Sequence, residues 1–372
     1  MTNKTGWLVL LSAWAALSLE AAWYDKMTVN GYFSHEYEKR LSGDTCDKPG
    51  CPDPNGSFDA DMFDLVFNFQ PTDRLRIAAD LTWEHGVQSE IAKGNIASEY
   101  TFAEYTVSDL LRIRAGKMFT PFGIYNEIHT AKPAFVIMKE PNPTNKMYFI
   151  EKGDEGLYFY PRWGSGIAAV GNGFAGSMPF DYAVMIANGD REYDGSGDHG
   201  NEYDKDDNPQ KGYTARLRLN PTDDWQVGAS LYRDRLNNYD ANDDLNGTGE
   251  LMSLGLQSMW HITDRIGLEL EFMTGYYDRD QKERIDRYGF SILPTWLVDG
   301  DRVTLYFLYA EADPNLDKSN NKVRIYQPGV NIEIDDNLFL KLELYNVRAE
   351  RNNALLSGAE YTEFRSAIAI GF

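Results

Sequence analysis

The chain has 372 residues, a formal net charge of −21, a mean hydropathy of −0.49 and 13% aromatic residues. This acidity excludes a surface built to bind nucleic acid, which selects basic surfaces. No long apolar run follows the amino-terminal segment, which excludes a helical membrane protein, since each helical span needs about 20 consecutive apolar residues.

The amino-terminal segment, 1–22, is typical of a cleavable signal peptide. Lys4 supplies a basic start, 7–17 is apolar, and Ala21 and Ala22 offer a cleavage site. The alternative interpretation is an amphipathic first helix of a soluble domain. We expect export, with 23–372 as the mature chain.

The two cysteines, Cys46 and Cys51, lie together in TCDKPGCPDPNG. An exported chain enters an oxidising compartment, so we predict that they form a disulfide within one loop. A pair of free thiols is the alternative. The short loop that such a bond would close predicts little effect on stability.

From about residue 27 onward, side chains alternate between apolar and polar. Leu268 and Leu270 alternate with Glu269 and Glu271, for example, and the same pattern recurs in 75–84 and 338–344. Successive side chains of a strand point to opposite faces, so each such run predicts a strand with one apolar and one polar face. The runs predict about sixteen strands, beginning near 27, 58, 74, 98, 111, 154, 180, 211, 225, 250, 265, 286, 301, 322, 338 and 361.

The segments between these strands alternate in length. Short turns rich in Pro, Asp and Asn lie at 71–73, 108–110, 221–224, 262–264, 298–301 and 335–337. Long polar segments lie at 41–57, 87–96, 119–150, 189–210, 236–249, 278–286, 313–321 and 350–359. Short turns on one side and long loops on the other are typical of outer-membrane β-barrels. We therefore predict an all-β, antiparallel up-and-down transmembrane barrel of about sixteen strands in the outer membrane of a Gram-negative bacterium. Because the glycines in 154–188 make hairpin ends unclear, a count two lower is the alternative.

The end of the sequence supports the barrel. The last predicted strand alternates and finishes at Phe372. Outer-membrane barrels commonly end in such a strand with a terminal aromatic residue, so we interpret Phe372 as a signal for the barrel assembly machinery. The net charge either keeps surface loops soluble, or attracts divalent cations that bridge to anionic lipopolysaccharide, or gives the barrel a weak preference for cations.

Four segments carry a resemblance to a known family: IRAGKMFTPFGIYNE (113–127), DEGLYFYPRWGSG (154–166), FDYAVMIANGD (180–190) and ARLRLNPTDDWQVGAS (215–230). With them the chain resembles the porin superfamily that includes the phosphate-selective porins of the O and P type. The resemblance implies a porin barrel and the homotrimer habitual in the family. It does not specify a solute.

The longest loop, 119–150, is the candidate constriction, because a polar loop of this length is usually functional. By analogy with porins we expect it to fold into the lumen, with Glu127, His129 and Lys132 facing the pore. An ordinary external loop is the alternative.

Alternation also predicts charged residues on the inner wall. The candidate pore-lining residues on the strands are Arg76, Arg112, Arg114, Lys117, Arg216, Arg218, Glu269 and Glu271. Arginines on the third and fifth strands would face acids on the eleventh across the ring, which would produce a transverse field. The alternative is that each charge is simply solvated by the lumen.

We expect a passive diffusion channel for small hydrophilic or ionic solutes, including anions such as phosphate. No H-E-x-x-H or G-x-S-x-G motif appears, so we expect no enzyme, and we expect no cofactor or metal. A structural sheath around a multihaem cytochrome partner is the alternative function.

Overall fold

The computed structural model describes residues 24–43, 54–84, 96–128, 130–145, 159–189, 209–239, 245–279, 283–300, 302–352 and 358–372. The predicted signal peptide, 1–22, and the predicted pairing of Cys46 with Cys51 lie outside the described residues and stay predictions.

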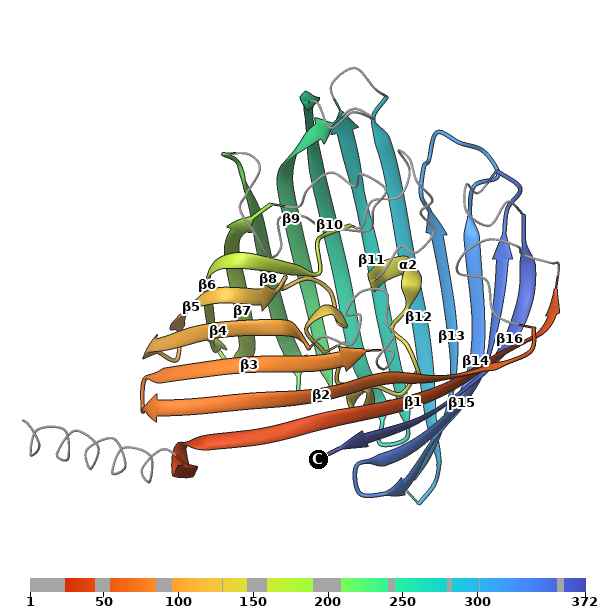
Figure 1. Cartoon of the computed structure of the whole chain (residues 1–372), viewed down its shortest axis with the longest axis horizontal. Helices are drawn as coiled ribbons and strands as arrows, with labels where there is room; N and C mark the ends of the chain where they lie inside the picture. Colours follow the sequence, from red (N-terminus) through yellow and green to blue (C-terminus); the bar gives the residue numbers. More distant parts are fainter. Residues whose placement is uncertain are drawn as a thin grey trace, which may run out of the picture.

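Sixteen strands form one sheet, in which each strand pairs antiparallel with the next and β16 pairs with β1, so the sheet closes into a barrel (Figure 1). The strands are β1 (Met27–Gly43), β2 (Ser57–Thr72), β3 (Leu75–Glu84), β4 (Ala97–Ser108), β5 (Leu111–Phe119), β6 (Trp163–Ala175), β7 (Met178–Asn188), β8 (Lys211–Thr222), β9 (Trp225–Tyr239), β10 (Leu245–Thr263), β11 (Ile266–Arg279), β12 (Ile285–Asp299), β13 (Val303–Asp313), β14 (Val323–Asp335), β15 (Leu338–Ala349) and β16 (Glu360–Gly371). The predicted fold and strand number are confirmed, and the lower count is wrong.

The short elements are η1 (Tyr24–Lys26), η3 (Asn126–Ile128), η4 (Lys132–Ala134) and α2 (Asn142–Asn145). Within the described part of the chain, no helix has the length and apolar character to cross a membrane.

Each even-numbered strand from β2 to β14 is joined to the next strand by a connection of two or three residues. These connections lie at one end of the barrel, called here the short-turn end. The other connections are longer and lie at the long-loop end, so the predicted alternation is confirmed. Threonines shape two of the short turns. The Thr72 Oγ1 accepts a hydrogen bond from the Leu75 amide, and the Thr263 Oγ1 accepts one from the Ile266 amide, both at 3.0 Å. A hydroxyl that bonds the backbone three residues on favours a tight turn.

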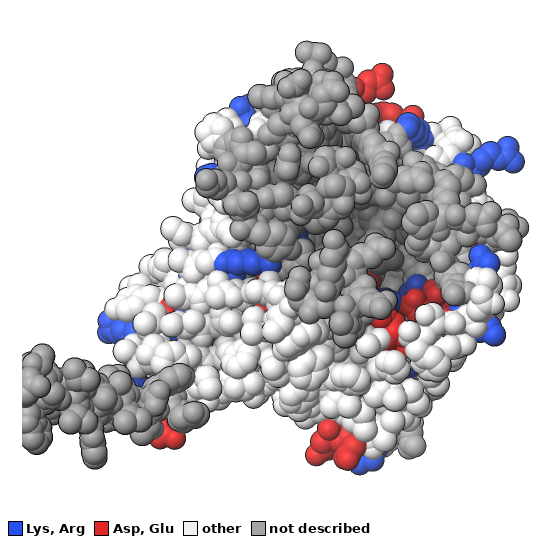
Figure 2. All heavy atoms as spheres, viewed as in Figure 1, with Lys and Arg blue, Asp and Glu red and all other residues white. Residues whose placement is uncertain are grey.

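The described outer wall carries few charged side chains, as the mostly white surface in Figure 2 shows, and aromatic side chains lie toward both of its ends. Near the short-turn end lie Trp225, Trp260 and Trp296, all exposed. Near the long-loop end of β12 lies Tyr288, eight positions before Trp296 on the same face. Eight residues extend about 27 Å along a strand, or about 21 Å across a membrane at a tilt of about 40°. This height approaches the apolar band of about 25 Å in outer-membrane barrels.

Strand starts agree with the sequence prediction to within two residues except at two places. β10 begins at Leu245, five residues before the predicted start near 250, and the larger difference is at β6. We expected a strand to start near 154, but β6 begins at Trp163. The aromatic residues Phe159 and Tyr160, which extended the predicted strand, instead pack inside the barrel, where both are 3% exposed. The residues immediately before them, 146–158, lie outside the described ranges.

The barrel is closed beside Phe372. The Gly31 amide donates to the Phe372 carbonyl at 2.8 Å, and the Phe372 amide donates back to the Gly31 carbonyl at 3.0 Å. A β-carbon on Gly31 would lie 2.4 Å from the Phe372 ring, so only glycine leaves room for that ring. The role of Phe372 in assembly stays a prediction.

Candidate pore wall and lumen loop

The described part of the connection between β5 and β6, 120–128, 130–145 and 159–162, lies inside the barrel and is called here the lumen loop. In Figure 1 its short helices lie between the strands of opposite walls. Its side chains and backbone contact inward-facing residues of β1, β2, β3, β8, β9, β11 and β15. The loop is therefore fastened around most of the ring.

The turn at Gly123 fastens the loop to β9 and β11. The Gly123 amide donates to the Ser230 hydroxyl at 3.2 Å, and the Ile124 amide donates to the Glu271 Oε1 at 2.7 Å. Gly123 has a φ of +66°, and a β-carbon there would lie 2.5 Å from the Glu271 Oε1. Glycine is therefore required both for the left-handed backbone and for the close approach of the carboxylate.

The predicted acidic wall residues bind the loop. Glu271 is 3% exposed, and the Tyr125 hydroxyl donates a hydrogen bond to the neighbouring Glu269. Burial raises the pKa of Tyr125 well above its usual value, and the adjacent Glu269 carboxylate raises it further, so this hydroxyl keeps its proton. Both acids lie on the inner wall as alternation predicts, but they serve as acceptors for the loop.

Lys341 fastens the loop on the opposite side. Its Nζ, on β15, donates to the carbonyls of Lys132 at 2.6 Å and Ile137 at 2.9 Å, and also to that of Phe135. The side chain is 1% exposed. Next to it, the Met138 amide donates to the Glu343 Oε2 at 3.3 Å. One ammonium group thus fixes a full bend of the loop.

Ion pairs complete the attachment. The Lys139 Nζ lies 2.8 Å from Glu36 and 2.6 Å from Glu38, both on β1. Lys132 lies 3.8 Å from Asp61 on β2 and is 6% exposed. Burial alone would lower the pKa of Lys132, but the nearby carboxylates, Asp61 foremost, outweigh burial and raise it. Lys132 is therefore a buried, charged anchor.

Glu127 pairs with Arg216 on β8. The carboxylate contacts the guanidinium directly, and Arg216 is 6% exposed. Burial alone would raise the pKa of Glu127, but the positive charge of Arg216 outweighs burial and lowers it. His129, the third residue predicted in this loop, lies outside the described residues.

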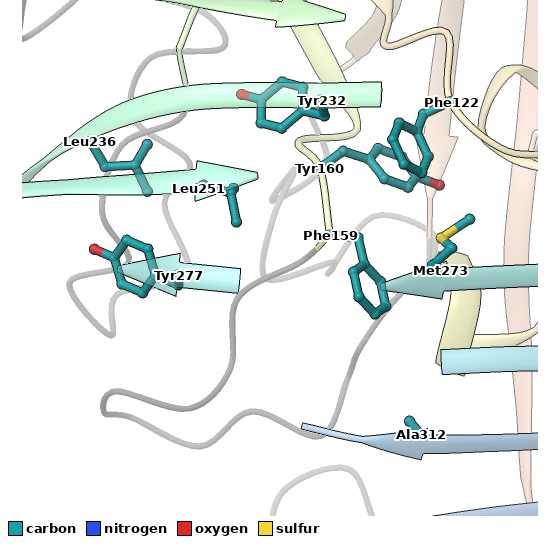
Figure 3. Packing of buried hydrophobic residues seen from close by; sticks show 9 residues of the cluster. All are labelled: Phe122, Phe159, Tyr160, Tyr232, Leu236, Leu251, Met273, Tyr277 and Ala312. Atoms are coloured by element: carbon teal, nitrogen blue, oxygen red, sulfur yellow. The ribbon is translucent and has the colours of Figure 1, made fainter. Parts of the chain in front are cut away.

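Apolar packing supports the same loop (Figure 3). The Phe122 ring stacks on Tyr160 with 4.3 Å between ring centres, and both pack with Met273 of β11 in one buried cluster. The other members of this cluster are Phe159, Tyr232, Leu236, Leu251, Tyr277 and Ala312. The lumen at this level is filled by apolar side chains on the β9 to β11 side.

The arginines lie on the wall beside the loop, near the short-turn end. Arg76 of β3, Glu104 of β4 and Arg114 of β5 are directly opposite one another in the sheet. Glu104 accepts from the Arg76 Nε at 3.3 Å and from the Arg114 Nε at 2.5 Å. Both guanidinium groups also lie over the Phe102 ring, at 5.3 and 5.0 Å. The pairing register therefore brings two of the predicted arginines together around an acid that we did not predict.

Polar contacts continue from this group to β8. Arg112 donates to the Asn172 Oδ1 at 3.3 Å, and the Arg218 Nε donates to Asp181 at 2.9 Å. Asn172 and Asp181 are directly opposite each other on β6 and β7. Asn172 and Asp181, like Glu104, fall on the inward positions of their strands, so alternation could have identified them.

A cavity of about 480 Å³ opens on this part of the wall. Its lining is basic and polar: Gln70, Asp73, Arg74, Leu75, Arg76, Glu104, Thr106, Arg112 and Arg114. The four arginines face two acids. The Arg112 Nε is buried and, among the described residues, has no hydrogen-bond partner. The cavity therefore has unused donors and an excess of positive charge, which suits an anion.

Lys117 corrects one expectation. It lies on the outer face of β5, one position from the inward Gly116 and Met118, because each step along a strand reverses the face. Its Nζ donates to the Ser98 carbonyl at 2.6 Å and lies 4.9 Å from the Trp163 ring centre. We leave Lys117 out of the proposed pore lining. Among the described residues, no group of three or more His, Cys, Asp or Glu is arranged to hold a metal ion.

A closed sixteen-stranded wall with short turns at one end, long loops at the other and one loop folded inside is the architecture of a porin-type outer-membrane barrel. The anion-selective porin from Comamonas acidovorans has a similar structure, with a TM-score of 0.63, 11% identity, and 93% of this chain and 99% of that chain covered. OprB of Pseudomonas putida, in a high-pH structure, has a TM-score of 0.62 at 10% identity, with 96% and 97% covered. The trimer form of OmpT, an outer membrane protein of Vibrio cholerae, has a TM-score of 0.56 at 10% identity, with 93% and 99% covered. At these identities the comparison establishes the fold.

Sequence comparison adds little to this classification. No family model matches the chain. A segment of 90 residues, 24% of this chain, is 29% identical to an uncharacterized protein of Aquifex aeolicus, and the match spans 20% of that protein's length. The resemblance to the phosphate-selective porins stays a prediction.

Proposed function

We propose that the chain is an outer-membrane channel for passive diffusion of small hydrophilic or ionic solutes, with a modest preference for anions such as phosphate. The observation that carries this proposal is the arginine-lined cavity beside the lumen loop. Arg76, Arg112 and Arg114 lie on one wall of the lumen, and Arg216 and Arg218 extend the basic surface to β8.

The preference is modest because acids offset most of these charges. Glu104 lies between two arginines, Asp181 pairs with Arg218, and Glu127 pairs with Arg216. The remaining excess of positive charge attracts anions along a narrow path where solvent screens poorly. No bond is made or broken in this function, so it needs neither a catalytic group nor a cofactor.

The lumen loop supports a channel over a sheath for a cytochrome. The loop is bonded to β1, β9, β11 and β15, so it occupies cross-section that a protein partner would need. The trimer form of OmpT supports the further proposal of a homotrimer, embedded in outer-membrane lipid and lipopolysaccharide and inserted by the barrel assembly machinery.

Conductance of the purified chain in planar lipid bilayers tests the channel, and the reversal potential in a KCl gradient tests the anion preference. Replacing Arg112 and Arg114 with Gln should shift the reversal potential toward cations, most strongly at 0.01 M salt, where the Debye length is about 30 Å. Lys117→Gln, on the outer face, is the control and should leave it unchanged. A chain that conducts nothing would overturn the channel, and an unchanged reversal potential in the arginine variant would overturn the anion preference alone.

A further inference from the structure

The outer face of the barrel carries a charged group at the long-loop ends of β12 to β15 that the channel does not use. Lys322, Arg324 and Arg348 are called here the rim cations. Arg324 and Arg348 share the outward face of their strands with exposed apolar residues such as Leu344. The Lys322 side chain turns to the same face, because its Nζ bonds the outward Tyr288 and Glu311. All three are partly exposed, with 35% of the Lys322 side chain, 32% of Arg324 and 57% of Arg348 accessible.

The rim cations sit on a continuous row of rings. The ring centres of Tyr288 and Phe290 are 6.4 Å apart, those of Phe290 and Tyr309 5.6 Å, and those of Tyr309 and Tyr326 5.2 Å. Lys322 lies 5.4 Å from the Tyr288 ring centre, and Arg348 lies 5.4 Å from that of Tyr326. Outward aromatic rows mark the level where hydrocarbon meets headgroups, so these cations lie at headgroup level.

Glu311, which is 7% exposed, holds the rim cations and the tyrosine side chains beside them in place. It accepts hydrogen bonds from Tyr288 at 2.5 Å, from Tyr309 at 3.2 Å and from the Arg324 Nε at 2.8 Å. Hydrogen bonding to Tyr288 raises the pKa of Lys322 to about 12, so the lysine remains charged beside the membrane. The donors are thus fixed in position before any lipid arrives.

Each guanidinium has five N–H donors, more than its protein contacts use. Arg324 bonds Glu311 and lies 3.1 Å from Glu350. Arg348 lies 3.1 Å from the exposed Glu360, and its Nε donates to the Asn346 Oδ1 at 3.3 Å. Planar guanidinium groups bind phosphate with two parallel hydrogen bonds, which fits a phosphorylated headgroup whose chains lie over the tyrosine rings. We propose that the rim cations bind the phosphate groups of an anionic lipid in the outer leaflet of the membrane.

The test uses the full folded barrel in detergent and measures lipid retained per protein by native mass spectrometry. The probe is lipid A with its two phosphates, with the same lipid stripped of phosphate for comparison. EDTA is present throughout, so that divalent cations cannot bridge the phosphates to Glu350 or Glu360. The variant is Arg324→Gln with Arg348→Gln, and its matched control is Arg265→Gln with Arg302→Gln in the short turns. Folding of each variant is checked by its heat-dependent mobility on a gel.

We expect the double rim variant to bind lipid A about tenfold more weakly for each lost arginine–phosphate contact, while the control stays within about twofold of the wild type. The phosphate-free lipid should bind the wild type and both variants alike. An equal loss of lipid A binding in the double rim variant and in the control would overturn the proposed site. Undiminished lipid A binding by the double rim variant would overturn it as well. Removal of Arg324 takes away one of the two cations paired with Glu311, the other being Lys322. Arg348→Gln alone is therefore a second variant, which keeps the pair of Arg324 with Glu311, and it should still weaken lipid A binding.

Discussion

Replacing Lys341 with methionine should release the lumen loop from β15. Three loop carbonyls accept hydrogen bonds from this one Nζ. A hydrogen bond to a charged group contributes about 1.5–3 kcal/mol, and three would exceed about 4.5 kcal/mol. The methionine removes the desolvation penalty of the ammonium, which offsets part of this loss. We therefore expect a net loss of about 3 kcal/mol, or about a hundredfold in the ratio of docked to undocked loop.

Hydrogen–deuterium exchange measured over 120–139 reports this ratio directly. Exchange in the lumen loop of the Lys341→Met variant should accelerate by about a hundredfold, and single-channel recordings should show more frequent conductance steps. Lys117→Met is the matched control, because it also removes a lysine that donates to a backbone carbonyl, but on the outer face. Unchanged exchange in the lumen loop of the Lys341→Met variant would mean that Lys341 does not hold the loop against β15.

Three further predictions address the wall, the turn and the ion pair. Leu270→Arg, on the lipid face, should cost about 2–4 kcal/mol in urea unfolding from lipid vesicles, and an unaffected midpoint would mean that the register is displaced by one residue. Gly123→Ala should loosen the loop, since the new β-carbon would lie 2.5 Å from the Glu271 Oε1, and normal exchange at 120–128 would contradict this. The pKa of Glu127 is lowered in the folded chain by its pair with Arg216. The stabilisation from this pair is therefore complete above the ordinary glutamate pKa of about 4.3, and it is lost as the pH falls through the lower pKa of the folded state. The difference in thermal stability between wild type and Glu127→Gln should therefore be constant from about pH 7 to about pH 5 and shrink only below about pH 4, whereas a difference that vanishes by about pH 6 would contradict the assignment.

The wall could be predicted from the sequence because its two signals are local. Alternation assigns each side chain to a face, and the contrast between short turns and long loops assigns each end of the barrel. Lys341, Glu269 and Glu271 all lie on the inner wall as alternation predicts. The error at 154 has a local cause as well, since Phe159 and Tyr160 end an apolar run of the kind that strands favour, 157–160, but pack inside the lumen.

The pairing of side chains across strands could not be predicted in the same way. The register between β4 and β5 shifts by one residue between Thr106 and Ser108. Counting outward from the two-residue turn would therefore place Glu104 opposite Ala115, whereas the structure places it opposite Arg114. Alternation places Arg76, Glu104 and Arg114 on the same inner face, but without this shift Glu104 cannot be assigned its position directly between the two arginines.

The attachments of the lumen loop depend on still longer separations. Gly123 and Ser230 are 107 positions apart, and Met138 and Glu343 are 205 apart. Alternation predicts which side chains point into the lumen. Which side chain each of them contacts depends on how the strands are arranged around the closed barrel. This is why Lys132 and Glu127 were expected to face the pore and instead form ion pairs with the wall.

The same separations set an order of events during folding. The lumen loop follows β5 in the chain, yet it docks on strands from β8 to β15, which are synthesised after it. Its docking sites are complete only when the later half of the sheet has paired, and closing such long segments of chain is slow. The complete set of loop contacts can therefore form only after the later strands have taken their places in the sheet. A barrel whose loop is not docked has a wider passage than the finished protein, so it would let through solutes that the docked loop holds back.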